Sequence, residues 1–115
     1  MRRGTTPLHK FYVDADLSDL DVLYITYEQN GSVVLEKELE EVEINVEEKM
    51  ISTRLSQDET LLFDATGKNG TMSEFTFIND DRVRIQIRWR RNDDRAYASD
   101  IITTTVEEIL KDGEI

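Results

Sequence analysis

The fold class is indicated by one stretch, residues 82–91, which reads Arg-Val-Arg-Ile-Gln-Ile-Arg-Trp-Arg-Arg. Its apolar side chains alternate with polar or basic ones and stand at Val83, Ile85, Ile87 and Trp89. Successive side chains of a β-strand point to opposite faces, so this period of two predicts a strand with one buried and one solvated face. Such strands are typical of antiparallel sheets that cover a core on one side only.

The length and the charge of the chain limit its possible functions. It has 115 residues, which fit one domain over residues 1–115, and it contains no cysteine that could form a disulfide, a thiolate nucleophile or a metal site. With 25 acidic and 14 basic side chains the formal net charge is −11, which disfavours binding to nucleic acid or to an anionic membrane. No cofactor signature is present. Residues 1–7 lack the apolar segment of a secretory signal, so we expect synthesis and folding in a cytoplasm.

A β-hairpin is expected around Asn30-Gly31. Residues 21–28 are rich in strand-forming side chains, with Leu23, Ile25 and Tyr27 on one face. The Asn-Gly pair follows at once, and both residues tolerate the positive φ angles of a tight type I′ turn. Residues 32–39 then form the returning strand.

The remaining segments complete an all-β pattern with a single helical turn. Ser56 and Glu59 have the spacing of a capping box, in which each side chain accepts a hydrogen bond from the other residue's backbone N–H. Further strands are expected over residues 11–13, 41–46, 50–55, 75–78 and 95–106, with a last short strand or turn over 107–113. Seven or eight short strands separated by turn residues predict an immunoglobulin-like antiparallel β-sandwich with one short helical turn.

The arginines of residues 82–91 have two interpretations. Their solvated face could bind an anionic partner, or it could pair with glutamates on neighbouring strands, each pair contributing about 0.2–1 kcal/mol. We favour pairing within the chain. The acidic side chains expected to take part are Glu36, Glu38, Glu41, Glu43, Glu47 and Glu48.

Three other constellations could carry chemistry, and each has a simpler explanation. The aspartates at Asp14, Asp16, Asp19 and Asp21 could form a calcium loop but lack its glycine and distal glutamate, so a solvated turn is favoured. His9, the single histidine, is expected at the surface or at a strand end. No catalytic triad can be assembled around it, so we expect no enzymatic activity. The aromatic residues are expected in the core, although they could line a ligand pocket; they are Phe11, Tyr24, Tyr27, Phe63 and Trp89.

Three segments together resemble a known protein family: residues 2–7 (Arg-Arg-Gly-Thr-Thr-Pro), 24–31 (Tyr-Ile-Thr-Tyr-Glu-Gln-Asn-Gly) and 98–113. The chain resembles small structural proteins encoded by phages and prophages of Gram-positive bacteria of the Clostridia type. Its start and its strand order are also similar to the immunoglobulin-like N-terminal domain of phage baseplate upper proteins. The segment 66–81 is longer than the usual connection in the family. No catalytic residues are implied by the resemblance.

The resemblance implies a non-enzymatic virion structural or accessory protein of the tail or baseplate. Its partners would be other phage structural proteins or copies of itself, with no nucleic acid and no membrane. An exposed sheet edge would serve as an assembly surface, because unpaired strand edges favour strand addition. The partner-contact residues expected on the basic strand are Arg84, Arg88, Arg90 and Arg91. The alternative is a soluble module that recognises a host protein or a surface carbohydrate through exposed aromatic residues such as Tyr12 or Tyr97.

Overall fold

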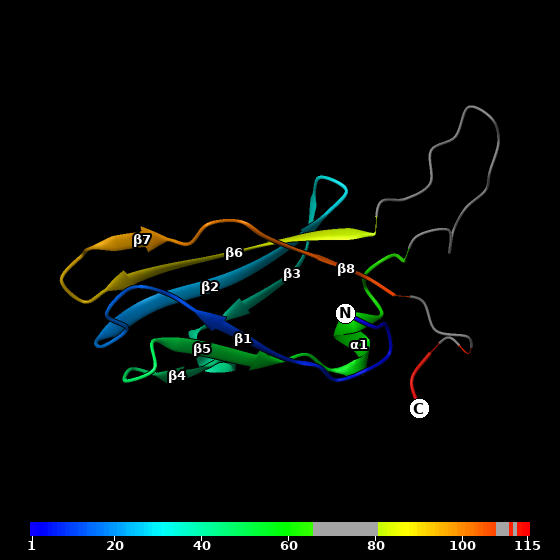
Figure 1. The fold of residues 1–115 in the computed structure, drawn as a ribbon, viewed down its shortest axis with the longest axis horizontal. Coiled ribbons are helices and arrows are strands. Elements are labelled where there is room, and N and C mark those ends of the chain that lie inside the picture. The colour runs from blue at the N-terminus through cyan, green and yellow to red at the C-terminus, as the bar shows by residue number, and fades with distance from the viewer. Residues whose placement is uncertain (66–80, 108–110, 112) are drawn as a thin grey trace.

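A computed structural model of the protein describes residues 1–65, 81–107, 111 and 113–115. Its strands form two antiparallel sheets. In the larger sheet, β3 (Ser32–Glu38), β2 (Leu20–Gln29) and β6 (Arg82–Arg91) lie side by side, and β7 (Ala96–Ala98) and β8 (Ile102–Thr105) both pair with the far edge of β6. The smaller sheet has the order β1 (Leu8–Tyr12), β5 (Met50–Arg54), β4 (Glu43–Asn45) (Figure 1). The prediction of an all-β antiparallel sandwich of seven or eight strands is confirmed, and the described residues form eight.

Strand β6 has the alternation that its sequence predicts. Val83, Ile85, Ile87 and Trp89 are buried in the core, whereas the arginines between them face outward. β6 runs antiparallel to β2 with Ile25 opposite Ile87 and Tyr27 opposite Ile85. The inward residues of these two central strands therefore form the middle of the core.

The β2–β3 hairpin is also confirmed. Asn30 and Gly31 have φ angles of 52° and 81°, as the tight turn requires. Leu23, Ile25 and Tyr27 are all buried on the inward face of β2. A register shift after Tyr27 bends the hairpin near its turn.

The smaller sheet differs from the prediction at both of its outer strands. The strand predicted over 41–46 is shorter, because the 3-10 helix η1 (Leu39–Glu41) takes its first residue and Val46 lies exposed in the turn that follows. β1 begins at Leu8, earlier than the predicted 11–13. Its additional residues pair with β5 in one continuous register.

The long strand predicted over 95–106 is interrupted. Ser99 lies between β7 and β8, where its Oγ accepts the N–H of Ile87 at 3.0 Å and its own N–H donates to the carbonyl of Ile87 at 2.8 Å. The side chain thus takes the place of a backbone group, and the ladder is interrupted over residues 99–101 before β8 resumes it. Two short strands result.

The helical turn is α1 (Gln57–Thr60), and its predicted capping box is present. Ser56 Oγ accepts the N–H of Glu59 at 3.1 Å, and Glu59 Oε1 accepts the N–H of Ser56 at 2.8 Å. The strand predicted over 75–78 lies outside the described residues, as does part of the predicted 107–113 segment.

Candidate functional site

The arginines of β6 are paired mainly with β2 and with the loop before it. Arg84 contacts Glu28 at 3.1 Å, Arg90 forms an ion pair with Asp21, and Arg91 lies 3.4 Å from Asp16. Pairing within the chain is therefore present, but the predicted acidic partners on residues 36–48 were wrong. The reason is topological, because β2 separates β3 from β6 and β4 belongs to the other sheet.

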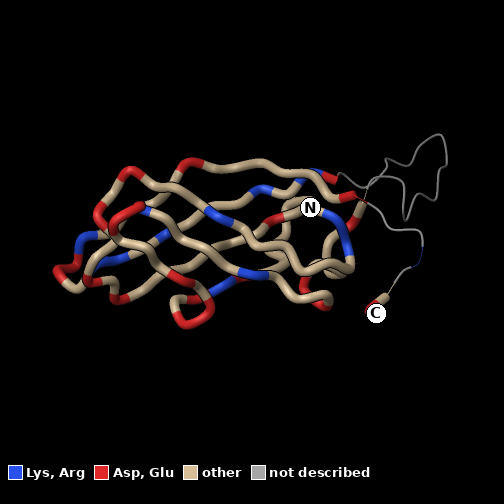
Figure 2. Tube along the Cα trace, turned by 60° about the horizontal axis from the view of Figure 1, so that its bottom comes forward, with Lys and Arg blue, Asp and Glu red and all other residues tan. Residues whose placement is uncertain are grey.

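The four arginines predicted to contact a partner differ in their surroundings. Arg84, Arg90 and Arg91 already have carboxylate neighbours, which an acidic partner would have to displace. Arg88 lies opposite Tyr24 and forms no ion pair with any residue that the structure describes. Acidic and basic positions are interleaved along the described chain instead of being gathered at opposite ends (Figure 2). The contact role of these arginines stays a prediction.

The aspartates before and at the start of β2 are held by hydrogen bonds and by basic side chains. Asp16 Oδ1 accepts the N–H of Ser18 at 2.9 Å, and this bond lowers the pKa of the Asp16 carboxyl, with a smaller contribution from Arg91. Asp14 lies 3.5 Å from Lys49. Within residues 1–65, 81–107, 111 and 113–115, no group of three or more His, Cys, Asp or Glu residues is placed to hold a metal ion.

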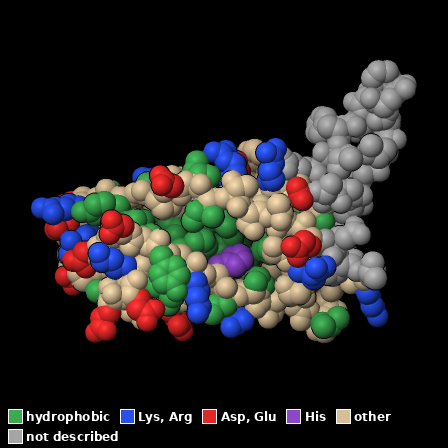
Figure 3. All heavy atoms as spheres, viewed as in Figure 1, with side chains coloured by type: hydrophobic (Ala, Val, Ile, Leu, Met, Phe, Trp, Pro, Cys, Tyr) green, Lys and Arg blue, Asp and Glu red, His purple; other side chains and the backbone are tan. Residues whose placement is uncertain are grey.

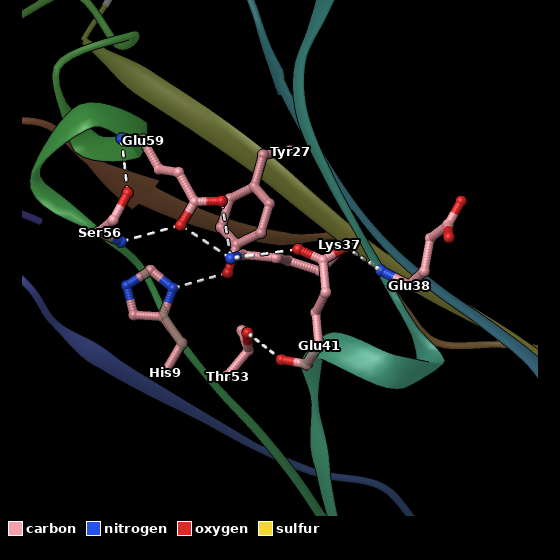
Figure 4. Close-up of polar contacts among 8 residues, drawn as sticks. All are labelled: His9, Tyr27, Lys37, Glu38, Glu41, Thr53, Ser56 and Glu59. Carbon is pink, nitrogen blue, oxygen red and sulfur yellow. Dashed lines mark hydrogen bonds and ion pairs between the residues drawn. The ribbon is translucent and has the colours of Figure 1, made fainter.

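A cluster of polar side chains lies between the two sheets beside α1 (Figure 4). Lys37 is only 5% exposed, and its Nζ contacts the two carboxylate oxygens of Glu59 at 2.7 and 2.8 Å. Glu41 approaches the same ammonium group at 3.6 Å. Next to this pair, His9 Nδ1 and the Tyr27 hydroxyl share a hydrogen bond of 2.7 Å.

The ionisation of this cluster follows from its burial. Burial raises the pKa of Glu59, but the hydrogen bonds from Lys37 and Ser56 and the charge of Lys37 outweigh it, so the net shift is downward. Burial also lowers the pKa of His9, helped by the positively charged N-terminus, and raises the pKa of Tyr27. Lys37 and Tyr27 are closed off from solvent, whereas the side chains of Glu41 and Glu59 are partly exposed. The cluster therefore links β3 to α1 within the fold.

Sequence reasoning did not find this cluster. No prediction was made for Lys37, which stands between Glu36 and Glu38 in the sequence. The sequence does contain a signal for its burial. Lys37 stands two residues from both Leu35 and Leu39, and alternate residues of an extended chain share one face, so its side chain is expected to point inward with theirs. His9, expected at the surface or at a strand end, is the second residue of β1 and is half-buried.

The larger sheet extends beyond the smaller one and leaves a groove. Tyr97 of β7 lies opposite Trp89, and Ile102 of β8 lies opposite Ile85, so both occupy the inward face of the sheet. They are nevertheless 38% and 41% exposed. In Figure 1 the smaller sheet lies below the level of β7, and β1 is its uppermost strand.

This groove, between β1 and the β7–β8 edge, has a volume of about 430 Å³. Phe11 and Ile87 contribute to its wall, and the rings of Trp89 and Tyr97 stack in it with centroids 5.7 Å apart. Figure 3 shows hydrophobic side chains gathered in a hollow on this face. The Trp89 indole N–H is buried and has no hydrogen-bond partner among the described residues.

The aromatic residues divide between the core and the surface. Phe11, Tyr27, Phe63 and Trp89 are buried, as predicted, whereas Tyr24 is 38% exposed on the outward face of β2. Tyr24 was therefore wrongly included among the core candidates, because its position alternates with those of Leu23 and Ile25.

The opening segment that carries the family resemblance wraps around α1. Arg3 is buried, and its guanidinium donates to the carbonyls of Phe63 at 2.7 Å and Leu61 at 3.0 Å. The Thr60 hydroxyl donates to the carbonyl of Thr5 at 3.0 Å. These contacts give Arg3 and Thr5 a structural role, as partners for polar groups of the helical turn and of the chain that follows it.

Comparison of the chain with protein-family models, with curated proteins and with solved structures finds no match. Among the described residues, none of the helices has the length and apolar character needed to cross a membrane.

Proposed function

We propose that this protein is a non-enzymatic structural or accessory component of a phage particle, in its tail or baseplate, and that it acts through protein–protein contacts. The observation that supports contact-based function best is the groove under β7 and β8, beside the outer edge of β1. Clusters of exposed apolar side chains and open strand edges are typical of protein-binding surfaces. The assignment to a phage rests on the family resemblance of residues 2–7, 24–31 and 98–113.

Labelling of particles tests this proposal. Antibodies against the protein should give immunogold label on purified phage or induced prophage particles, at the tail or baseplate. A protein of the same size should also sediment with the particles and resist a salt wash. Absence of label and of co-sedimentation from every particle preparation would overturn the proposal, and flanking metabolic genes would argue against it.

A second candidate function is recognition of a host protein or a surface carbohydrate. It is favoured by Tyr12 and Tyr97, which line the groove and are 68% and 38% exposed. Aromatic rings held in place by stacking, as Tyr97 is on Trp89, offer flat apolar faces to a ligand.

A glycan array distinguishes this candidate from the first. If the groove binds carbohydrate, the wild-type protein should bind defined glycans and Tyr97→Ala should lose that binding. Tyr24→Ala is the matched control, because Tyr24 has the same 38% exposure but lies on the outward face of β2. An array without a single reproducible glycan signal would exclude recognition of a carbohydrate by the groove.

A further inference from the structure

We infer that the groove receives an extended segment of a partner protein, in which apolar and basic residues alternate, and that this segment adds as a further strand to the outer edge of β1. The inference rests on the proposed function and specifies the chemistry of the partner. It is carried by the outer edge of β1 and the inward face of β7 and β8, both of which the described residues leave uncovered, and by the charge of the groove.

The hydrogen-bond register of β1 shows which backbone groups are available. Val13 donates to the carbonyl of Lys49 at 3.0 Å, and Leu55 donates to the carbonyl of Pro7 at 3.0 Å. Because bonded residues alternate along an antiparallel pair, His9 and Phe11 turn their N–H and C=O groups toward β5, on the same side as the Pro7 carbonyl and the Val13 N–H. Leu8, Lys10 and Tyr12 therefore turn theirs to the opposite side, where the described residues provide no strand.

A strand added at this edge would cover what the smaller sheet leaves open. It would extend the order β4-β5-β1 by one strand and lie beneath β7 and β8. Its inward side chains would then meet Trp89, Tyr97 and Ile102. Its outward side chains would stand beside Leu8, Lys10 and Tyr12, which are exposed on the other face of the smaller sheet. A segment with an apolar residue at every second position would place its apolar side chains in the groove and its other side chains on the outer face of the smaller sheet.

The charge of the groove determines which residue types fit the remaining positions of the bound segment. Asp14 on the β1 side, which lies 3.5 Å from Lys49, and Asp100 on the β7–β8 side line it, and none of its lining residues is basic. The whole chain adds a formal net charge of −11. Lysine or arginine between the apolar residues of the segment would complement this field, and acidic residues would be repelled.

The same geometry disfavours a second copy of this chain at the β1 edge. If a second copy docked through its own β1, its strands β7 and β8 would occupy the same volume as β7 and β8 of the first copy. A single extended segment carries no second sheet packed over it, so it avoids this collision. We therefore assign the groove to a tail or loop of another protein.

Titration with synthetic peptides tests the inference on the whole 115-residue chain. The probe is an acetylated and amidated peptide of about seven residues, a typical strand length, in which valine and lysine alternate. The chain contains one tryptophan, and it lines the groove, so fluorescence of Trp89 reports occupancy directly. We expect saturable binding of this peptide, and at least about tenfold weaker binding when glutamate replaces lysine.

Backbone methylation then separates strand addition from simple apolar binding. One peptide carries N-methyl groups on its valines and another carries them on its lysines, because alternate residues of a strand direct their N–H groups to opposite edges. Binding should be lost for one of the two only: the lysine-methylated peptide if the segment is antiparallel to β1, the valine-methylated one if it is parallel. No binding by the unmethylated peptide, or equal behaviour of the two methylated ones, would overturn the inference.

Two neighbouring substitutions on β8 provide a matched pair of variants. Ile102→Asp places a charge inside the groove, whereas Thr103→Asp places it on the opposite face of the same edge strand, across from Arg84. Both positions are exposed, so both variants should fold. We expect Ile102→Asp to weaken peptide binding by about tenfold or more and Thr103→Asp to leave it within about twofold. Equal effects would contradict the placement of the segment.

Lys10→Pro tests the edge itself. Proline is accepted on edge strands where the lost N–H faces away from the sheet, as it does at Lys10. This variant should keep the fold, verified by circular dichroism, and lose peptide binding, although it removes a positive charge that repels the probe. Binding equal to that of the wild type would oppose strand addition.

The inference can fail while the proposed function stands. If wild-type protein and Ile102→Asp label particles equally, the protein belongs to the particle but attaches by another surface. If the wild-type protein labels no particle, the proposed function itself is wrong, whatever the peptides show.

Discussion

At the residue scale, the most constrained side chain is that of Lys37. A buried ammonium group is tolerated only when a carboxylate and hydrogen bonds compensate its desolvation, and Glu59 provides both. Glu59 also completes the capping box of α1 through Ser56. The same carboxylate thus links β3 to the helical turn.

Lys37→Met should lower the free energy of unfolding by roughly 3 kcal/mol, because it leaves the Glu59 carboxylate partly buried without its cation. Urea denaturation followed by circular dichroism would measure this change. The double variant Lys37→Met, Glu59→Gln should recover part of the loss, since glutamine keeps the capping bond without a charge. Lys10→Met is the control on an exposed lysine and should stay within about 0.5 kcal/mol of the wild type. A Lys37→Met variant as stable as this control would show that the pair contributes little.

His9 should make stability depend on pH below neutrality. Its folded-state pKa is lowered from 6.5 by burial, so the unfolded chain binds the proton more readily than the folded one. The stability contributed by neutral His9 is therefore complete above 6.5 and is lost as the pH falls toward the folded-state pKa. Glu59, whose pKa is lowered from 4.5, acts in the same direction but in a more acidic range.

We expect the free energy of unfolding to fall between about pH 7 and pH 5 in the wild type and to change much less in His9→Gln. Denaturation curves at a series of pH values would show the difference, and an NMR titration of the imidazole would place its pKa below 6.5. An imidazole pKa above that value would contradict the burial argument.

At the element scale, β1 has one edge paired with β5 and one edge without a neighbouring strand among the described residues. Hydrogen exchange should reveal the alternation residue by residue. The amides of His9, Phe11 and Val13 point to β5 and should exchange slowly, whereas those of Leu8, Lys10 and Tyr12 should exchange rapidly. Amide exchange followed by NMR would detect this pattern. Uniform protection along β1 would mean that its outer edge is already covered.

The outward arginines of β6 should contribute little to folding. Arg84→Glu combined with Arg88→Glu should cost at most roughly 1–2 kcal/mol, because Arg84 loses an exposed ion pair with Glu28 and Arg88 has no carboxylate partner among the described residues. Thermal unfolding would measure this cost. The inward control Ile85→Glu should prevent folding, since Ile85 is buried in the core. If the arginines contact a partner, the double variant should fold but lose association with particles.

At the scale of the whole molecule, net charge opposes compaction. The formal charge of −11 is confined to dimensions of 53 × 32 × 18 Å. At about 10 mM salt the screening length is roughly 30 Å, so repulsion acts across most of the molecule. The exposed ion pairs of β6 and β2 have the opposite salt dependence but contribute at most about 1 kcal/mol each.

We therefore expect the free energy of unfolding to rise when sodium chloride increases from about 10 to 150 mM at pH 7. Urea denaturation at both salt concentrations would measure the change. The difference in stability between the wild type and Arg84→Gln should shrink over the same range, because salt screens the pair that this substitution removes. A fall in wild-type stability would mean that local ion pairs outweigh the global repulsion.

Local patterns along the sequence were sufficient to predict the sandwich, the burial of β6, the Asn30-Gly31 hairpin and the capping box of Ser56. Each depends on residues close together in the chain, through side-chain alternation, backbone φ preference or hydrogen bonds across one turn. The order of the strands was decided by the tertiary structure alone. Because β2 lies between β3 and β6, Arg84 pairs with Glu28 and not with the glutamates of β3 or β4. The burial of Lys37, the break at Ser99 and the groove beside β1 likewise depend on which strands become neighbours, and residues distant in sequence decide that together.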